Sequence, residues 1–330
     1  MFFHPSVMLF VFFLLFSLIM MISMSSWFMI WFFIEMNLLS FIPLILLKKN
    51  KYSVESSLKY FFIQTISSIM ILMGMILLFM NIKFYNLLFI SSLSIKLGLA
   101  PFHQWIVNIV EGFSWPLMWV FLTVQKIGPF VLFSYIYNME KSVIWVIYFI
   151  SLLCAFFGCL GGLYMSSLRK IMVFSSISHN SWLILGMMLS TYLWFIYFIF
   201  YSIILLSVLY IFMSYYIGSL NQMFLKLNFF TSMVLGVGVL SLGGLPPLSG
   251  FVPKFIYMKE FLLFYNYFIL LFLLLSVFIS LFFYCRLFIY NFIYMSNKNF
   301  FLSSKNMTIN IIMYINIMGF IFLPWVMFIY

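Results

Sequence analysis

Charged residues are scarce in this sequence. Of its 330 residues, 16 are Lys or Arg and 5 are Asp or Glu, so only 6% of the chain is charged. Hydrophobic residues make up 67% of the chain. A soluble domain needs a largely polar surface, so this composition excludes one and indicates that lipid surrounds most of the chain. The polar stretches are no longer than about fifteen residues, the usual upper length of a loop.

Cysteine and cofactor motifs are also scarce. The three cysteines, Cys154, Cys159 and Cys285, form no metal-ligand or disulfide pattern. The sequence contains no P-loop, dinucleotide fingerprint, zinc pattern, haem motif or iron–sulfur spacing. We therefore expect the chain to bind no redox cofactor and to carry out no hydride or electron chemistry by itself. The net charge of +11 comes from scattered lysines, which argues against nucleic acid as a partner.

Apolar runs of about twenty residues, long enough to cross a bilayer, are abundant. They predict an all-α polytopic membrane protein with about eleven transmembrane helices. The first run lacks a basic start and a cleavage site, so we interpret it as a spanning helix rather than a signal peptide. The expected helices are 5–24, 26–47, 54–80, 84–109, 114–137, 142–165, 168–189, 192–217, 228–258, 260–293 and 307–329.

Basic residues in the predicted loops indicate the orientation. The connections after the second, sixth, eighth and tenth helices contain Lys48, Lys49, Lys51, Arg169, Lys170, Lys226, Lys298 and Lys305. The odd-numbered connections contain only Lys83, Lys141 and Lys259. The positive-inside rule therefore places the N-terminus on the side equivalent to the cytoplasm, and an odd number of helices places the C-terminus on the other side.

Two of the predicted helices are interrupted by proline and glycine. The fourth contains Gly98 and Pro101, and the ninth contains Gly243, Gly244, Pro246 and Pro247. The breaks lie five helices apart, and an odd offset inverts the second copy relative to the first, as in transporters built from inverted repeats. We expect one membrane domain with repeats at about 1–137 and 142–293, plus an extra helix at about 307–329. Two unrelated proline kinks are the alternative.

Four charged residues lie within apolar runs: Glu35, Lys96, Lys126 and Lys254. A charge at the centre of a spanning helix costs about 2.5–3.5 kcal/mol, so it normally faces protein or water and marks an ion or proton path. Lys96 is the natural partner of Glu35. A lysine such as Lys126, buried without a carboxylate in its own helix, can exist as a neutral amine that exchanges protons. The alternative is a set of static polar contacts.

Other polar residues admit two interpretations. His103 and His179 either shuttle protons or hydrogen-bond a neighbouring helix. Glu55 and Lys59, four residues apart, are expected to form an interfacial ion pair. Arg286 is either an interior charge or an anchor whose head group reaches the membrane surface.

Several phrases together resemble NADH–ubiquinone oxidoreductase chain 2, a family of antiporter-like membrane-arm subunits of respiratory complex I. The resemblance extends over nearly the whole chain. The phrases are Glu35-Met36-Asn37-Leu38-Leu39-Ser40-Phe41-Ile42-Pro43, Lys96-Leu97-Gly98-Leu99-Ala100-Pro101-Phe102-His103, Gln125-Lys126-Ile127-Gly128-Pro129, Gly161-Gly162-Leu163 with Ser167-Leu168-Arg169-Lys170-Ile171-Met172, Ser175-Ser176-Ile177-Ser178-His179, and Leu240-Ser241-Leu242-Gly243-Gly244-Leu245-Pro246-Pro247-Leu248-Ser249-Gly250-Phe251 with Pro253-Lys254.

The resemblance implies a proton channel with a Glu–Lys pair (Glu35 and Lys96), a central lysine (Lys126) and an exit-side lysine (Lys254). It implies the inner mitochondrial membrane, with the N-terminus in the matrix and the C-terminus in the intermembrane space. The implied partners are other membrane-arm subunits, including antiporter-like neighbours and accessory subunits, and lipids such as cardiolipin. NADH, FMN, iron–sulfur clusters and ubiquinone would then belong to other subunits. A stand-alone cation/proton antiporter and a passive membrane-arm scaffold remain the alternatives.

Overall fold

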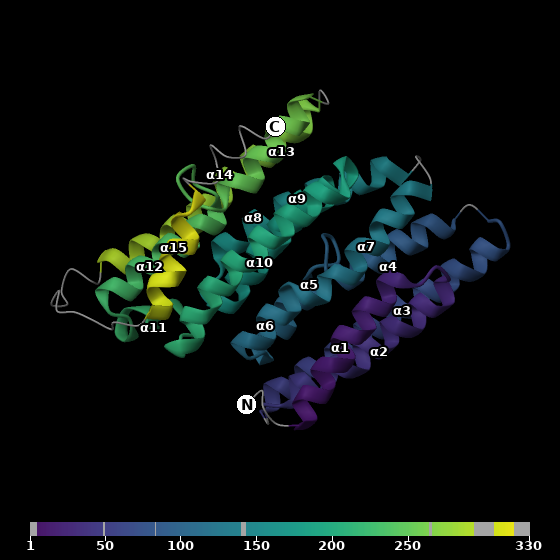
Figure 1. The fold of residues 1–330 in the computed structure, drawn as a ribbon, viewed down its shortest axis with the longest axis horizontal. Helices are drawn as coiled ribbons and strands as arrows, with labels where there is room; N and C mark the ends of the chain where they lie inside the picture. Colours follow the sequence, from purple (N-terminus) through teal and green to yellow (C-terminus); the bar gives the residue numbers. More distant parts are fainter. Residues whose placement is uncertain are drawn as a thin grey trace. The chain divides into compact units, whose positions relative to one another are not determined.

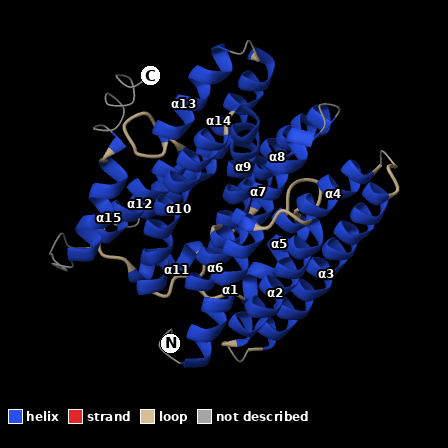
Figure 2. Ribbon diagram, turned by 45° about the vertical axis from the view of Figure 1, so that its right-hand side comes forward, coloured by secondary structure: helices blue, strands red, loops and turns tan. Residues whose placement is uncertain are grey.

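The computed structural model describes residues 5–48, 50–82, 84–139, 143–263, 266–293 and 307–319. This described part is built of helices and contains no strand, as Figures 1 and 2 show. Eight of its helical segments are long and apolar enough to cross a membrane. The predicted all-α polytopic membrane class is therefore confirmed. The chain divides into two compact units, Met1–Ile150 and Ser151–Tyr330, which are described separately below.

The first unit begins with three long helices that pack in sequence order, α1 against α2 and α2 against α3. α4 packs between α3 and α7, and α7 also packs on α1. Buried aromatic side chains fill the space between these helices, with ring centroids of Phe41 and Tyr60 5.2 Å apart and those of Phe113 and Phe121 also 5.2 Å apart. The helices are α1 (Pro5–Ser23), α2 (Trp27–Leu46), α3 (Lys51–Phe79), α4 (Tyr85–Leu97), α5 (Gln104–Ile109), η1 (Val110–Gly112), α6 (Trp115–Leu122) and α7 (Val124–Met139), followed by the start of α8 (Ile144–Tyr164).

The fourth predicted span is broken where the sequence indicated. α4 ends at Leu97, and Gly98 adopts a left-handed conformation with φ of 61°. The amide of Leu99 donates to the carbonyl of Ser94 and that of Gly98 to Ile95, which is the Schellman arrangement that ends many helices. Pro101 and His103 lie in the turn that follows, before α5 begins. The glycine is required here because a side chain disfavours this backbone conformation.

The fifth predicted span, 114–137, is divided in the structure, which the sequence analysis did not foresee. α6 ends at Leu122 and α7 begins at Val124, with Thr123 between them. The Thr123 hydroxyl donates to the carbonyl of Trp119, 2.6 Å away, and shares this acceptor with the Thr123 amide, which is 3.0 Å away. Pro129 in α7 has no amide hydrogen to offer the carbonyl of Gln125. The two pieces still make one span, but the helix is irregular next to Lys126.

The second unit contains the other broken span. α12 ends at Gly243, and α13 starts at Phe251. α12 packs against α10, α14 and α15, and α13 against α9, α10 and α14. The helices are α8, continuing to Tyr164, α9 (Leu168–Leu189), α10 (Thr191–Ser214), α11 (Leu220–Lys226), α12 (Phe229–Gly243), α13 (Phe251–Leu263), α14 (Tyr267–Ile293) and α15 (Met307–Ile317).

Two features of this unit differ from the prediction. α13 continues to Leu263, past the predicted end at 258, because Glu260 and Lys259 continue the helix instead of interrupting it. The short helix α11 was not expected. α15 covers the start of the predicted helix 307–329, whose remainder from residue 320 lies outside the described residues. The inverted relation of the two repeats stays a prediction.

Candidate functional site

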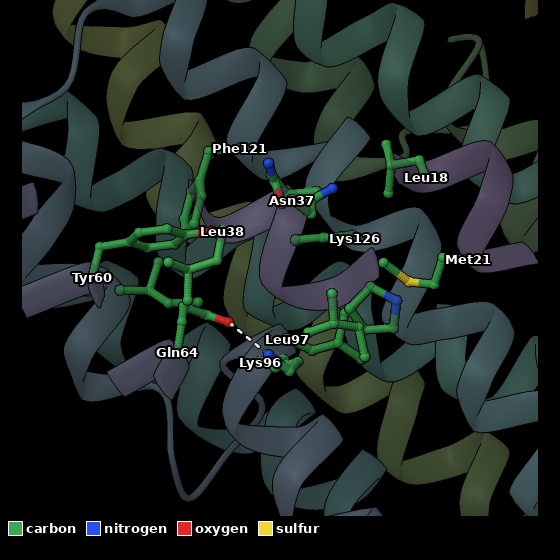
Figure 3. Close-up of a pocket in the computed structure, with 14 residues that line it drawn as sticks. Leu18, Met21, Asn37, Leu38, Tyr60, Gln64, Lys96, Leu97, Phe121 and Lys126 are labelled. Atoms are coloured by element: carbon green, nitrogen blue, oxygen red, sulfur yellow. Dashed lines mark hydrogen bonds between the residues drawn. The ribbon is translucent and has the colours of Figure 1, made fainter. Parts of the chain in front are cut away.

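A small cavity in the first unit contains two of the predicted lysines. It has a volume of about 40 Å³, and Lys96 and Lys126 both line it (Figure 3). At roughly 10–15 Å³ per water molecule, a cavity of this size has room for about three or four waters. Its other polar lining residues are Asn37, Tyr60, Gln64 and Gln125, and apolar side chains such as Leu18, Met21 and Phe121 complete the wall.

Lys96 reaches the cavity from the last turn of α4. Its ammonium Nζ donates to Oε1 of Gln64 on α3, 3.4 Å away, as the dashed line in Figure 3 shows. This ammonium does not cap the carbonyls at the end of α4. The indole Nε1 of Trp105 donates to one of them, the carbonyl of Ile95, over a distance of 3.1 Å. Lys96 is therefore directed toward polar side chains in the cavity.

Glu35 does not form a direct ion pair with Lys96. The structure does contain the predicted ion pair of Glu55 and Lys59, whose charged atoms lie 2.5 Å apart. Among the described residues, no other ion pair is closer than 4 Å. Glu35 is half-buried and within electrostatic range of Lys96. The geometry of α2 explains the separation: Ile34, Asn37 and Leu38 line the cavity at helical spacing, and Glu35 lies about 100° around the helix from Ile34.

Lys126 lies in the first turn of α7, just after the interruption at Thr123. Its side chain is 4% exposed. Pro129, one turn later on the same face, also lines the cavity. The irregular backbone thus lies at membrane depth beside a polar cavity, which is where freed backbone groups are tolerated.

Two side-chain amides at the cavity have unused donors. Neither Nδ2 of Asn37 nor Nε2 of Gln125 has a hydrogen-bond partner among the described residues, although both atoms are buried. A buried donor without a partner costs about 1–3 kcal/mol, so such groups in native proteins normally bind water. These two amides, the Gln64–Lys96 bond and the cavity volume together indicate a hydrated pocket between Lys96 and Lys126.

The second unit holds Lys254, which was predicted to follow the second break. Its side chain is 5% exposed, and its Nζ donates to the carbonyl of Gly243 at 2.7 Å and of Leu242 at 3.5 Å. These carbonyls end α12, where the helix dipole places negative charge. Gly244 ends the helix in a left-handed conformation, with φ of 81°. Lys254 is therefore a cap of the broken helix as well as a buried titratable group.

Asn316 of α15 forms hydrogen bonds with α12 and with the loop between α12 and α13. The carbonyl of Asn316 accepts from the Ser249 amide at 3.0 Å. The Asn316 side chain bonds to the hydroxyls of Ser241, at 2.8 Å, and of Ser207, at 3.2 Å. The loop that contains Pro246 and Pro247 is thus held by the eleventh predicted helix.

The two histidines occupy different environments. His179 is buried in α9, and its Nδ1 lies 2.9 Å from the hydroxyl of Tyr197 on α10, in a bond whose direction depends on the tautomer. His103 is half-buried at the first break and is not among the residues that line the cavity. Arg286 is half-buried, and its guanidinium donates to the carbonyls of Leu163 and Met165 at the end of α8.

Sequence reasoning overlooked the amide side chains and the buried tyrosines. Gln64 and Asn37 each lie in a run that is otherwise mainly apolar, and an amide in that setting is the signal that would have identified them. No comparable signal distinguishes a buried tyrosine from a lipid-facing one, because 21 tyrosines are spread through the chain.

Comparisons with known proteins agree on one family. The sequence profile described as NADH:quinone oxidoreductase/Mrp antiporter, transmembrane, matches residues 23–83 and 79–280. NADH-ubiquinone oxidoreductase chain 2 of Anopheles gambiae is 40% identical over 261 residues, covering 75% of this chain and 74% of the relative. The protein of the same name from Locusta migratoria is 35% identical, covering 71% of this chain and 70% of the relative.

Solved structures share the fold. A chain of respiratory complex I from Thermus thermophilus superposes with a TM-score of 0.78 at 18% identity, covering 97% of this chain and 80% of that chain. A chain of an archaeal membrane-bound sulfane sulfur reductase gives 0.80 at 18% identity, covering 96% and 73%. A chain of the Mrp complex from Dietzia sp. gives 0.73 at 17% identity, covering 84% and 59%. At these identities, the likeness shows the fold alone.

Proposed function

The chain belongs to the family of NADH-ubiquinone oxidoreductase chain 2, and on this basis we propose that its buried lysines carry part of the proton path of the complex. It is a multi-pass subunit of the membrane domain of respiratory complex I, in the inner membrane. Electron transfer from NADH to ubiquinone, with FMN and iron–sulfur clusters, takes place in other subunits. The observation that supports a role in proton transfer is the polar cavity shared by Lys96 and Lys126.

The proposed step moves one proton between two amines. Protonated Lys96 releases a proton to water in the cavity, and the neutral amine of Lys126 accepts it on its nitrogen lone pair. Asn37, Gln64 and Gln125 hold that water by hydrogen bonds and remain uncharged. Glu35 acts on Lys96 through space: a negative Glu35 favours the charged form of Lys96, and neutralising Glu35 favours release of the proton.

Lys254 has the role of the exit-side lysine in this proposal. Release of its proton would also weaken its bonds to the two carbonyls that it caps in α12, because a neutral amine is a weaker donor than an ammonium, so proton transfer there would be linked to the geometry of the break. We further propose that the N-terminus faces the matrix, that the C-terminus faces the intermembrane space, and that antiporter-like neighbours, accessory subunits and cardiolipin contact the chain.

The experiment that tests this function replaces Lys126 in the assembled complex. Lys126→Met keeps apolar bulk but offers no nitrogen, and Lys126→Arg keeps a charge that is not released. We expect both variants to assemble and to pump fewer protons per NADH oxidised than the wild type. Lys51→Met, the same change at an exposed lysine at the start of α3, is the matched control and should pump normally.

Two outcomes would contradict the proposal. Wild-type pumping in the arginine variant would exclude loss of a proton from this residue as a step. Wild-type pumping in the methionine variant would favour the passive scaffold, in which the lysine serves packing alone.

A further inference from the structure

We propose that the second unit contains a hydroxyl relay, here called the tyrosine belt, that carries protons between His179 and the region of Lys254. The tyrosine belt consists of Tyr197, Tyr201, Tyr257 and Tyr284. The inference rests on the proposed function, because it assigns the route by which a proton would travel in the second unit. It adds residues that are not charged and therefore do not stand out in the sequence.

The belt brings together side chains from three helices around His179. Tyr197 and Tyr201 come from α10, Tyr257 from α13 and Tyr284 from α14. All four are 1–2% exposed. The ring of His179 lies 5.0 Å from that of Tyr201, and the ring of Tyr197 lies 5.1 Å from that of Tyr257. Tyr197 is within electrostatic range of the other three phenols.

A hydrogen bond and two close approaches connect the belt to α9. The hydroxyl of Tyr197 is 2.9 Å from Nδ1 of His179. Tyr201 lies close to Ser176, and Tyr284 lies close to Ser175. One face of α9 thus presents an imidazole and two hydroxyls, three or four residues apart, to the phenols of the neighbouring helices.

Tyr257 links the belt to the lysine. It lies three residues after Lys254 on α13, so both side chains project from the same side of that helix. Its hydroxyl has no hydrogen-bond partner among the described residues. Gly186 of α9 provides the space for it, since a Cβ added there would lie 1.7 Å from the Tyr257 oxygen. A buried hydroxyl without a protein partner normally binds a water molecule. Such a water would extend the row of tyrosine oxygens toward Lys254.

Phenol chemistry suits a relay. A tyrosine hydroxyl can accept one hydrogen bond and donate another at the same time. When His179 carries an extra proton, its Nδ1–H gives that proton to the Tyr197 oxygen while Tyr197 passes its own hydroxyl proton to the next oxygen. Tyr197 is neutral before and after the transfer, His179 returns to the neutral imidazole, and rotation of the hydroxyl resets the chain.

Packing alone does not account for these hydroxyls. Phenylalanine would fill the same volume without burying a polar group, and a buried hydroxyl without a partner costs about 1–3 kcal/mol. The chain does use tyrosine elsewhere on α10 without burying it: Tyr192 and Tyr210 are 63% and 41% exposed. The buried and exposed tyrosines of one helix therefore form a natural pair of test and control.

The test changes single tyrosines to phenylalanine in the assembled complex. Tyr197→Phe and Tyr257→Phe remove one oxygen each and keep the ring, and Tyr210→Phe is the matched control. The measurements are the amount of assembled complex, coupled proton pumping driven by NADH, and its solvent deuterium isotope effect. We expect normal assembly in all three, and in the two belt variants a loss of pumping rate of about tenfold or more with a larger isotope effect. This loss is smaller than the 10²–10⁴-fold typical of a lost acid–base group, because neighbouring hydroxyls remain.

Tyr257→Phe separates the relay from a structural role. Its hydroxyl makes no hydrogen bond with a described residue, so a purely structural account predicts an unchanged or more stable complex with wild-type pumping. Should Tyr197→Phe fail to assemble, this variant still decides the question. Wild-type pumping and isotope effect in Tyr257→Phe, together with blocked pumping in Lys254→Met, would overturn the belt and leave the lysine path intact. Wild-type pumping in Lys254→Met itself would instead contradict the proposed role of Lys254.

Discussion

Gly244→Ala offers a quantitative test of how Lys254 is held at the second break. Gly244 ends α12 with φ of 81°, in the left-handed region. An added Cβ would lie 2.8 Å from Cδ and 2.9 Å from Nζ of Lys254, closer than atoms normally approach. The alanine variant must therefore adopt an unfavourable backbone conformation and also displace the ammonium from the carbonyl of Gly243, which is 2.7 Å away in the wild type.

Both costs can be assigned magnitudes. The left-handed conformation costs a residue with a Cβ about 1–2 kcal/mol, and loss of a hydrogen bond from a charged group costs about 1.5–3 kcal/mol. The closed break is therefore destabilised by about 2.5–5 kcal/mol, and the lower value alone changes an opening equilibrium about 70-fold. Lys254→Ala removes the side chain that an added Cβ would meet. In that background, Gly244→Ala should destabilise the closed break only by the free energy of the left-handed backbone conformation, about 1–2 kcal/mol.

Hydrogen–deuterium exchange of the assembled complex measures this opening directly. The amide of Gly244 donates to Leu240 and Ser241, and that of Ser249 to Asn316, so both amides report on whether the break is closed. We expect their exchange in Gly244→Ala to accelerate about 70-fold or more. Gly218→Ala is the control, because a Cβ there meets only the side chain of Gln222 at 3.5 Å. Unchanged exchange at both amides would refute the proposed coupling between the helix cap and the lysine.

Two further predictions concern the charge pair and the orientation of the chain. Glu35→Gln should lower coupled pumping more than assembly, because the neutral amide keeps the volume but removes the through-space effect on Lys96; pumping at the wild-type rate and stoichiometry would argue against a switch at Glu35. Protease should cleave loop 48–51 in inverted inner-membrane vesicles, where the matrix side is exposed; cleavage only from the intermembrane-space side would reverse the proposed topology.

Much of the helical framework could be predicted because lipid imposes strict rules on the sequence. Runs of about twenty apolar residues correctly indicated the first three spans, and proline with glycine indicated both breaks, since few other residues tolerate a helix end at membrane depth. The interruption at Thr123 was not foreseen. The Thr123 hydroxyl there bonds back to the carbonyl of Trp119, but threonine makes such bonds in unbroken helices as well, so this residue gives no signal of a break.

The candidate site was predictable to the extent that its residues carry charge. Lys96 and Lys126 stood out in apolar runs, and the structure brings both to one cavity. Which neutral residue would face Lys96 could not be read from the sequence, because Gln64 lies 32 residues away and reaches the lysine only through the packing of α3 on α4. The tyrosines were inaccessible to sequence reasoning for a similar reason, since tertiary packing alone decides which of them are buried.

The carbonyls at the ends of α4 and α12 accept hydrogen bonds from different donors at the two breaks, and this difference bears on the roles proposed for the two lysines. At the first break, the indole of Trp105 and backbone amides occupy the carbonyls of Ile95 and Ser94, so the Lys96 ammonium can face Gln64 and the cavity. At the second, backbone amides reach Leu240 and Ser241, and the carbonyls of Leu242 and Gly243 are capped by Lys254 itself. A proton lost from Lys96 weakens one bond to a side-chain amide, whereas a proton lost from Lys254 weakens the end of a helix. Lys96 is therefore suited to exchange protons with water without a backbone change, and Lys254 is suited to link proton release to movement of the break.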